Sequence, residues 1–112
     1  MATYNRHDVV RVPFPFTDRA AEKNRPALIL SDRSAFNAPA AHSVMAMITS
    51  AVHARWPLDV PITDLPIAGL PAASIVRFKL FTLDHRLIRG VLGRLSDKDA
   101  AKVGKAVSRL LL

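Results

Sequence analysis

The feature of this sequence that most constrains its fold is a series of strand-length apolar runs, each interrupted by proline, glycine or polar residues. One of these runs, NRPALILS over residues 24–31, places Arg25 and Pro26 directly before four apolar residues. A short apolar run with such borders is typical of a strand buried on both faces. Pro26 fixes its own φ and biases Arg25 toward extended backbone, which predicts a rigidly held guanidinium at the mouth of the strand. A plain surface arginine before a strand-start proline is the other interpretation.

The remaining strands follow from alternation of apolar and polar residues. Pro61 limits one of them to a sheet edge. In 74–84, one parity carries Arg77 and Lys79, and the other carries Phe78 and Leu80, which predicts one basic face and one apolar face. The predicted strands are His7–Phe14, His42–Ser50, Leu58–Ile62, Ser74–Asp84 and Leu87–Leu95. The predicted connections, rich in turn residues or polar residues, are Thr17–Asn24, Asp32–Ala41, Ala51–Pro57 and Thr63–Ala73.

The C-terminal segment is the clearest helix in the sequence. Ser96 followed by Asp97 and Asp99 is close to a capping box, and acidic residues in a first turn favour the helix dipole. The residues that follow form one apolar stripe at helical spacing, namely Val103, Ala106, Val107, Leu110 and Leu111. This stripe is predicted to cover one face of the sheet or to pack against a second subunit. The sequence therefore predicts a mainly β fold, a strongly bent sheet or small barrel closed by a C-terminal helix, in a single domain spanning residues 1–112.

The charge balance predicts an anionic partner. The chain has 16 Lys and Arg against 9 Asp and Glu, a net charge of +7 and a pI of about 10.9. Eleven of the 16 cations are arginine, the side chain best suited to bidentate phosphate contacts. A nucleic acid or an acidic protein segment fits this surplus. Solubility of a small protein is the simpler explanation.

Several kinds of site are excluded or not expected. The chain has no cysteine, which excludes disulfides, a thiol nucleophile and cysteine-bound zinc. Its four histidines, at positions 7, 42, 53 and 85, show no metal-ligand spacing, so we expect no metal and no cofactor. No run has transmembrane length, and residues 1–8 lack the apolar core of a signal peptide. We therefore expect a cytoplasmic protein without a membrane partner.

A resemblance runs through nearly the whole chain in order. Its motifs are Asp8-Val9-Val10, the FPFT run Phe14 to Thr17, Arg25 to Ser31, Ile48-Thr49-Ser50, Asp59-Val60-Pro61, Ser74 to Arg77, Leu83-Asp84, and Leu92 to Ser96 before the final helix. Each motif alone is weak, but the ordered series resembles the MazF/PemK family of toxins. His7 stands where a glycine is common in that family, and the 17–24 loop lacks the usual glycine and serine, so the resemblance does not define a cleavage sequence.

The resemblance implies an SH3-like barrel, usually a homodimer, that acts as a metal-independent endoribonuclease on single-stranded RNA. Arg25 and Thr49 match the positions of the family's catalytic pair. The implied protein partner is an acidic antitoxin segment that occupies the RNA groove. Two other function classes remain open: a gyrase-poisoning toxin of the same fold, and a basic barrel that binds RNA without cleaving it.

The residue types at these two positions suit the implied chemistry. RNA is cleaved without a metal when its own 2′-hydroxyl attacks the adjacent phosphorus, so the protein has to align the attack, stabilise phosphoryl charge and manage two protons. The Arg25 fork can bind two phosphoryl oxygens. The Thr49 hydroxyl can donate to the phosphate or orient the 2′-hydroxyl. His53 is the nearest candidate base, or else a solvated loop histidine.

The predicted RNA contacts surround this pair. Trp56 beside Arg55 offers a stacking surface for an unpaired base, or else plugs the barrel end or a dimer interface. Arg77 and Lys79 are candidates to follow the RNA backbone, or are ordinary surface cations. The full predicted set of RNA-binding residues is Thr17, Ser50, His53, Arg55, Trp56, Ser74, Arg77 and Lys79.

Overall fold

The computed structural model describes residues 3–14 and 23–112. Its strands are β1 (Asp8–Phe14), β2 (Lys23–Ile29), β3 (His42–Ser50), β4 (Val60–Pro61), β5 (Ser74–Asp84) and β6 (Gly90–Arg94). Its helical segments are η1 (Arg33–Asn37), α1 (Ala38–Ala40), α2 (Leu65–Ala68), η2 (His85–Leu87) and α3 (Asp97–Leu111). The bounds of β1, β3, β5 and α3 follow the predicted ones closely. Strands β4 and β6 are shorter than predicted, and β2 begins at Lys23, so the last two residues of the predicted connection Thr17–Asn24 lie in a strand.

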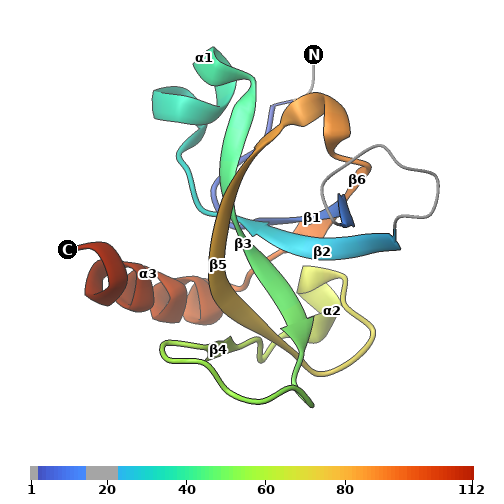
Figure 1. The fold of residues 1–112 in the computed structure, drawn as a ribbon, viewed down its shortest axis with the longest axis vertical. Helices are drawn as coiled ribbons and strands as arrows, with labels where there is room; N and C mark the ends of the chain where they lie inside the picture. Colours follow the sequence, from blue (N-terminus) through green and yellow to red (C-terminus); the bar gives the residue numbers. More distant parts are fainter. Residues whose placement is uncertain (1–2, 15–22) are drawn as a thin grey trace.

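The strands form a single antiparallel sheet in the order β4-β5-β3-β2-β1-β6. The sheet curls into a half-barrel, and α3 lies against one side of it (Figure 1). The predicted mainly β fold with a C-terminal helix is therefore confirmed. Within the described residues, no helix has both the length and the apolar character needed to cross a membrane.

The curled sheet buries an apolar cluster on each face. Neighbouring residues of β1 show the division, since Val9 belongs to one cluster and Val10 and Val12 to the other. Successive side chains of a strand point to opposite faces of the sheet, so Val9 and Val10 enter different clusters. Helix α3 covers the Val9 face with Val103 and Ala106, both buried.

The apolar stripe of α3 is only partly covered. Val103 and Ala106 are buried, but Leu110 is 40% exposed and Leu111 is 62% exposed. The first alternative, cover of a sheet face, therefore holds for Val103 and Ala106 and not for the last turn, and packing of that turn against a second subunit stays a prediction. That turn runs past the edge of the sheet, as Figure 1 shows.

The first turn of α3 is capped as the sequence predicts. The Ser96 hydroxyl accepts a hydrogen bond from the backbone N–H of Asp99 at 3.2 Å. The Asp99 side chain is fully buried and accepts from the Thr63 N–H (2.9 Å), the Thr63 hydroxyl (2.7 Å) and the Asp64 N–H (3.1 Å). Asp99 therefore ties the segment after β4 to the start of α3.

Two predicted connections contain helical turns instead of loop. In Asp32–Ala41, the Asp32 carboxylate accepts from the Ala35 N–H at 2.8 Å and starts η1, which continues into α1. Asn37 is buried and donates to the carbonyls of Tyr4 and Ser31. The contact with Tyr4 joins residues 33 positions apart, so the local pattern of turn residues does not reveal it.

The other connection, Thr63–Ala73, contains α2. The Asp64 carboxylate accepts from the Ile67 N–H at 3.2 Å and caps this helix. Gly69 ends it in a left-handed conformation with φ of 72°. A Cβ at Gly69 would lie 2.1 Å from the carbonyl oxygen of Leu92 in β6, so only glycine permits this approach of backbone to backbone.

Strand β5 contains a bulge that the alternation does not predict. Ala46 pairs with Leu80 and Met47 pairs with Arg77, which leaves Phe78 and Lys79 without partners on β3. The bulge breaks the two-residue period. The prediction of one basic and one apolar face is therefore wrong: Arg77 is buried at 8% exposure, whereas Leu80 is 40% exposed.

Candidate functional site

Strands β2 and β3 bring Arg25 and Thr49 to the same part of the sheet. Ala27 pairs with Met47, and two residues further along the same register Arg25 comes level with Thr49. The β2–β3 ladder stops at Ala27, next to Pro26, which has no N–H to donate. Beyond that point the two strands line an open pocket.

The position of Arg25 differs from the predicted one. It is the third residue of β2 and pairs with Val12 of β1, so it lies inside the strand and not at its mouth. Its guanidinium carbon lies 5.5 Å from the centroid of the Phe14 ring. Backbone pairing with β1 and this cation–π contact hold the side chain from two directions. These contacts, and not a position at the mouth of the strand, support the Arg25 side chain; its rigidity stays a prediction.

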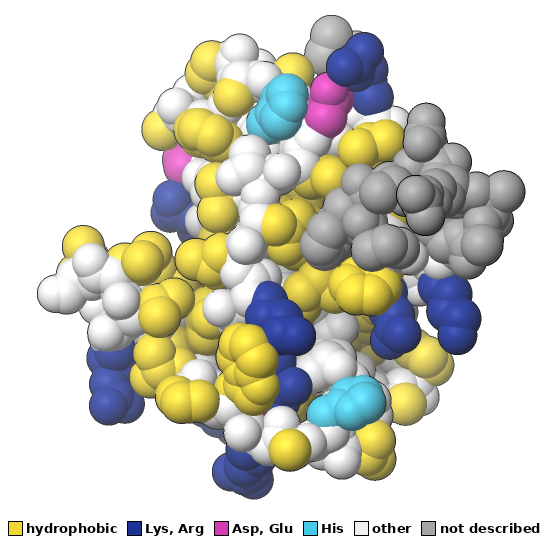
Figure 2. Space-filling view, viewed as in Figure 1, with side chains coloured by type: hydrophobic (Ala, Val, Ile, Leu, Met, Phe, Trp, Pro, Cys, Tyr) yellow, Lys and Arg dark blue, Asp and Glu magenta, His cyan; other side chains and the backbone are white. Residues whose placement is uncertain are grey.

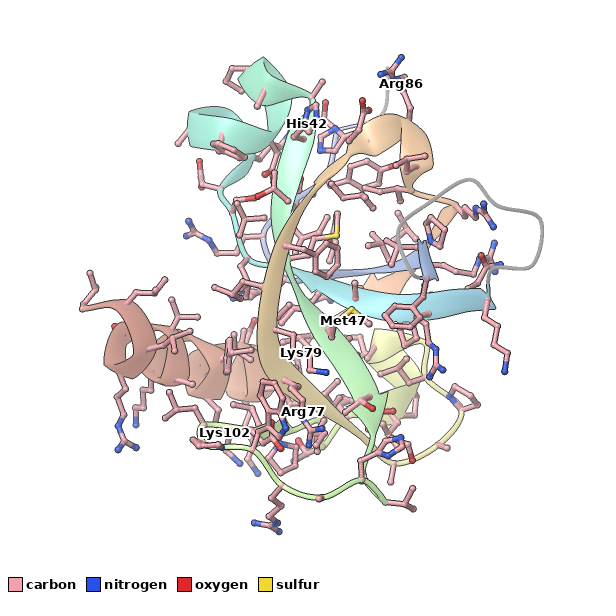
Figure 3. The ribbon with its side chains drawn as sticks, in the orientation of Figure 1. His42, Met47, Arg77, Lys79, Arg86 and Lys102 are labelled. Carbon is pink, nitrogen blue, oxygen red and sulfur yellow. The ribbon has the colours of Figure 1, made fainter. Side chains whose placement is uncertain are left out.

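Arg25 and Thr49, both half-buried, lie in the wall of a pocket of about 250 Å³. The pocket is lined by Phe14, Arg25, Met47, Ile48, Thr49, His53, Arg77 and Lys79. Figure 3 shows Met47, Arg77 and Lys79 close together on β3 and β5, with His42 and Arg86 at the opposite end of the molecule. Five of the predicted site residues therefore share one pocket.

A second hollow of about 210 Å³ adjoins the first. Its lining includes Arg25 and Thr49 again, together with Ser50, Ser74 and the segment 70–73. Ser50 pairs with Ser74 across β3 and β5, and the Ser74 hydroxyl donates to the carbonyl of Ala72 at 2.8 Å. Arg25 and Thr49 thus lie in the wall that the two hollows share.

The loop 51–59 supplies the other predicted residues. His53 is exposed and faces both the main pocket and a third hollow of about 220 Å³, which Arg55 also lines. Trp56 is 44% exposed, so it does not plug the barrel end in this chain. The Lys79 ammonium lies 4.9 Å and the Arg77 guanidinium carbon 5.2 Å from the centroid of the Trp56 ring.

Arg77 is not a free surface cation. Its guanidinium forms an ion pair of 2.9 Å with Asp59, and both side chains are less than a tenth exposed. Burial by itself raises the pKa of the Asp59 carboxyl, but hydrogen bonds from Arg77 and from the Trp56 N–H outweigh this effect and lower the pKa below its usual value. Asp59 therefore stays ionised at neutral pH and neutralises Arg77.

The surface around the pocket is positive. In Figure 2, most of the Lys and Arg side chains that are visible lie in the lower half of the face shown, and acidic side chains are visible only in its upper half, together with further basic side chains. Lys79 and Arg25 line the pocket, and the adjacent Arg55 is exposed. Among the described residues, no group of three or more His, Asp or Glu is placed to hold a metal ion.

One predicted residue, Thr17, lies outside the described residues. Sequence reasoning missed two residues that shape the site, Phe14 and Asp59. Phe14 was part of the quoted FPFT run, but nothing in the run indicates contact with Arg25. For Asp59, the register of the fold makes the contact: Val60 pairs with Val76, so the next pair along the ladder is Asp59 with Arg77, two opposite charges.

A comparison with protein-family models places residues 5–111 in one family, described as PemK-like, MazF-like toxins of type II toxin-antitoxin systems. The chain belongs to this toxin family. The resemblance seen in the ordered motifs is therefore confirmed over nearly the full sequence. A comparison with curated protein sequences gave no significant match.

Solved structures of MazF toxins share the fold. A mycobacterial endoribonuclease, solved in complex with its cognate antitoxin, superposes with a TM-score of 0.75 at 21% identity, covering 99% of this chain and 95% of that one. A MazE-MazF structure from Deinococcus radiodurans gives a TM-score of 0.73 at 24% identity, with 97% of each chain covered. The Mycobacterium tuberculosis toxin MazF-mt6 gives 0.70 at 21% identity, covering 91% and 93%.

Proposed function

We propose that this MazF/PemK-family chain is an endoribonuclease toxin that cleaves single-stranded RNA by attack of the RNA's own 2′-hydroxyl, without a metal ion. The observation that carries the proposal is the placement of Arg25 and Thr49 in the wall shared by two adjoining hollows. A guanidinium and a hydroxyl in this wall can both donate hydrogen bonds to the oxygens of one phosphodiester. Family membership and the endoribonuclease among the similar structures support the same activity.

In the proposed reaction, the 2′-oxygen forms a bond to phosphorus as the bond to the 5′-oxygen breaks. The 2′-hydroxyl proton goes to a base and the leaving 5′-oxygen takes up a proton, giving a 2′,3′-cyclic phosphate and a 5′-hydroxyl. Arg25 donates to two nonbridging oxygens, where negative charge grows in the transition state. Thr49 donates to the same phosphate or orients the attacking hydroxyl.

Proton transfer needs a group other than Arg25, because a guanidinium remains protonated at neutral pH. His53 lines the same pocket as Arg25 and Thr49, and imidazole is the side chain best matched to proton transfer near pH 7. We therefore propose His53 as the general base. Its exposure lets the proton pass to solvent after each turnover.

The same geometry supports a path for the RNA strand. Trp56 presents an exposed aromatic surface for an unpaired base, and Lys79 and Arg55 supply charge for phosphates on either side. Ser50 and Ser74 offer hydroxyls in the second hollow. We keep Thr17 as a proposed RNA contact on the strength of the FPFT run.

We further propose an acidic antitoxin segment as the protein partner, with the toxin acting as a homodimer. The net charge of +7 favours an acidic segment over a neutral one. Structures similar to this chain include a toxin bound to its cognate antitoxin and a MazE-MazF complex. An acidic segment lying on Arg25, Lys79 and Arg55 would compete directly with RNA.

The first test is cleavage of single-stranded RNA by the purified protein in excess EDTA. We expect products with 2′,3′-cyclic phosphate and 5′-hydroxyl ends, because no metal takes part in the proposed steps. Intact RNA after long incubation, together with tight RNA binding, would indicate a basic RNA-binding barrel. Inhibition of purified gyrase with no RNA cleavage would indicate the gyrase-poisoning class.

The positive surface predicts that RNA affinity falls with salt. Phosphate contacts from Arg25, Arg55 and Lys79 would give a log–log slope of about −2, which is a ~20-fold loss of affinity between about 50 and 200 mM salt. Fluorescence anisotropy with a labelled, noncleavable 2′-deoxy oligonucleotide measures this slope. Affinity that is independent of salt would contradict the proposed phosphate contacts.

A further inference from the structure

We propose that Asp59 is a positioning residue: its ion pair with Arg77 fixes the 51–59 loop, which carries His53, Arg55 and Trp56, against strand β5. The role in catalysis rests on the function proposed above. The role in holding the loop does not, and it can be measured without RNA.

The contacts of the Asp59–Arg77 pair form a closed network. Arg77 donates to both carboxylate oxygens of Asp59, from Nε at 3.3 Å and from Nη2 at 2.9 Å. The same Nη2 donates to the carbonyl of Ala54 at 2.5 Å, and the Asp59 carboxylate accepts from the Trp56 N–H at 2.8 Å. One ion pair therefore binds the backbone of the loop at two separate residues.

Apart from the Asp59–Arg77 network, the loop is held by the Lys79 ammonium, 4.9 Å from the centroid of the Trp56 ring, and by backbone hydrogen bonds such as that from the Ala51 N–H to the Ala73 carbonyl at 3.1 Å. Residues 51–57 are all exposed, so burial of apolar side chains contributes little to its position. The backbone adds hydrogen bonds near its ends, from the His53 N–H to the Ser50 carbonyl at 3.2 Å and from the Asp59 N–H to the Trp56 carbonyl at 3.3 Å. The middle of the loop, at Ala54, is held by Arg77.

Neutralisation of Arg77 by Asp59 gives the proposal a distinctive consequence. Arg77 lines the main pocket, but in the ion pair its charge is compensated and its Nε and Nη2 donors are used by Asp59 and Ala54. Asp59→Asn keeps the size of the side chain and removes its charge. This variant is expected to loosen the loop and to expose an uncompensated guanidinium beside the pocket. The affinity for RNA should then be unchanged or higher, while the rate of cleavage falls.

The first experiment measures the environment of the loop by the fluorescence of Trp56. Trp56 is the only tryptophan in the chain, so its emission reports on this loop alone. In Asp59→Asn without RNA, we expect a red-shifted emission maximum and stronger quenching by acrylamide. The matched control is Arg86→Gln, which removes the exposed 2.7 Å ion pair with Asp84 at the opposite end of the molecule. Emission and quenching equal to wild type in Asp59→Asn would overturn the proposal.

The second experiment separates positioning from folding. In Asp59→Asn, we expect the single-turnover cleavage rate at saturating protein to fall about tenfold, since small misplacements of reacting groups slow a reaction strongly. The dissociation constant for noncleavable RNA should be equal to or lower than that of wild type. A purely structural defect would instead weaken binding and lower the active fraction together. A wild-type rate in Asp59→Asn would contradict a role in catalysis.

A double variant keeps the test decisive if the single variant unfolds. Asp59→Asn with Arg77→Gln leaves no unpaired buried charge, so it should fold at least as well as Asp59→Asn alone. Its Trp56 emission should still be red-shifted, because hydrogen bonds between neutral side chains hold the loop less firmly than the ion pair does. An unshifted spectrum in the folded double variant would overturn the proposal. If wild type cleaves no RNA, the proposed function fails, and the fluorescence result still decides whether Asp59 holds the loop.

Discussion

Arg25→Ala is expected to lower the single-turnover rate of RNA cleavage about 100- to 1,000-fold, which corresponds to the loss of one preorganised donor to a transition-state oxyanion. We expect a large effect because the Arg25 side chain is positioned by the β1–β2 ladder and by its contact with the Phe14 ring. Affinity for noncleavable RNA should fall far less than the rate. Single-turnover cleavage and anisotropy measured on the same variant give the two quantities.

Two further variants make this prediction specific. Arg86→Ala removes an exposed arginine at the far end of the molecule and should cleave at the wild-type rate. Arg25→Lys keeps the charge but loses the planar fork, so it should recover only part of the rate. Equal losses of rate and affinity in Arg25→Ala would reduce Arg25 to a binding residue and contradict its proposed part in the reaction.

Asp99→Ala is expected to lower the free energy of unfolding by about 3 to 5 kcal/mol, because it leaves three donors without their partner, each worth about 1 to 3 kcal/mol. These donors are the N–H and hydroxyl of Thr63 and the N–H of Asp64. Urea unfolding followed by far-UV circular dichroism measures the change. Asp97→Ala is the matched control, since Asp97 lies in the same first turn but is exposed. A loss no larger than that of Asp97→Ala would show that the buried contacts contribute little.

The same carboxylate predicts part of the pH dependence of stability. Burial alone raises the pKa of Asp99, but hydrogen bonds from Thr63, Asp64 and Ser96 outweigh it and lower the pKa. Stabilisation by such a group is complete above the pKa of the unfolded state, about 4, and is lost as pH falls through the lowered pKa of the folded state. Below about pH 4, wild type should therefore lose stability more steeply than Asp99→Ala.

The candidate site shows where sequence reasoning succeeded and where it stopped. Pro26 beside an apolar run predicts Arg25 at the mouth of a strand, whereas the structure places it inside β2, where it pairs with Val12 and contacts the Phe14 ring. The alternation in residues 74–84 predicts an accessible Arg77, and the bulge at Phe78 and Lys79 makes that wrong. A bulge depends on how two strands fit each other, which the sequence of one strand does not encode.

The sequence by itself determined the approximate positions of the strands along the chain, the capped C-terminal helix and the positive charge, because these depend on local periodicity, capping residues and composition. Only the tertiary structure decided that Arg25 and Thr49 share a wall between two hollows, that Arg77 is paired with Asp59, and that Asp99 anchors the segment after β4. Each of these contacts joins residues far apart in the chain. Their partners are chosen by strand register and by the curl of the sheet, which are properties of the assembled fold.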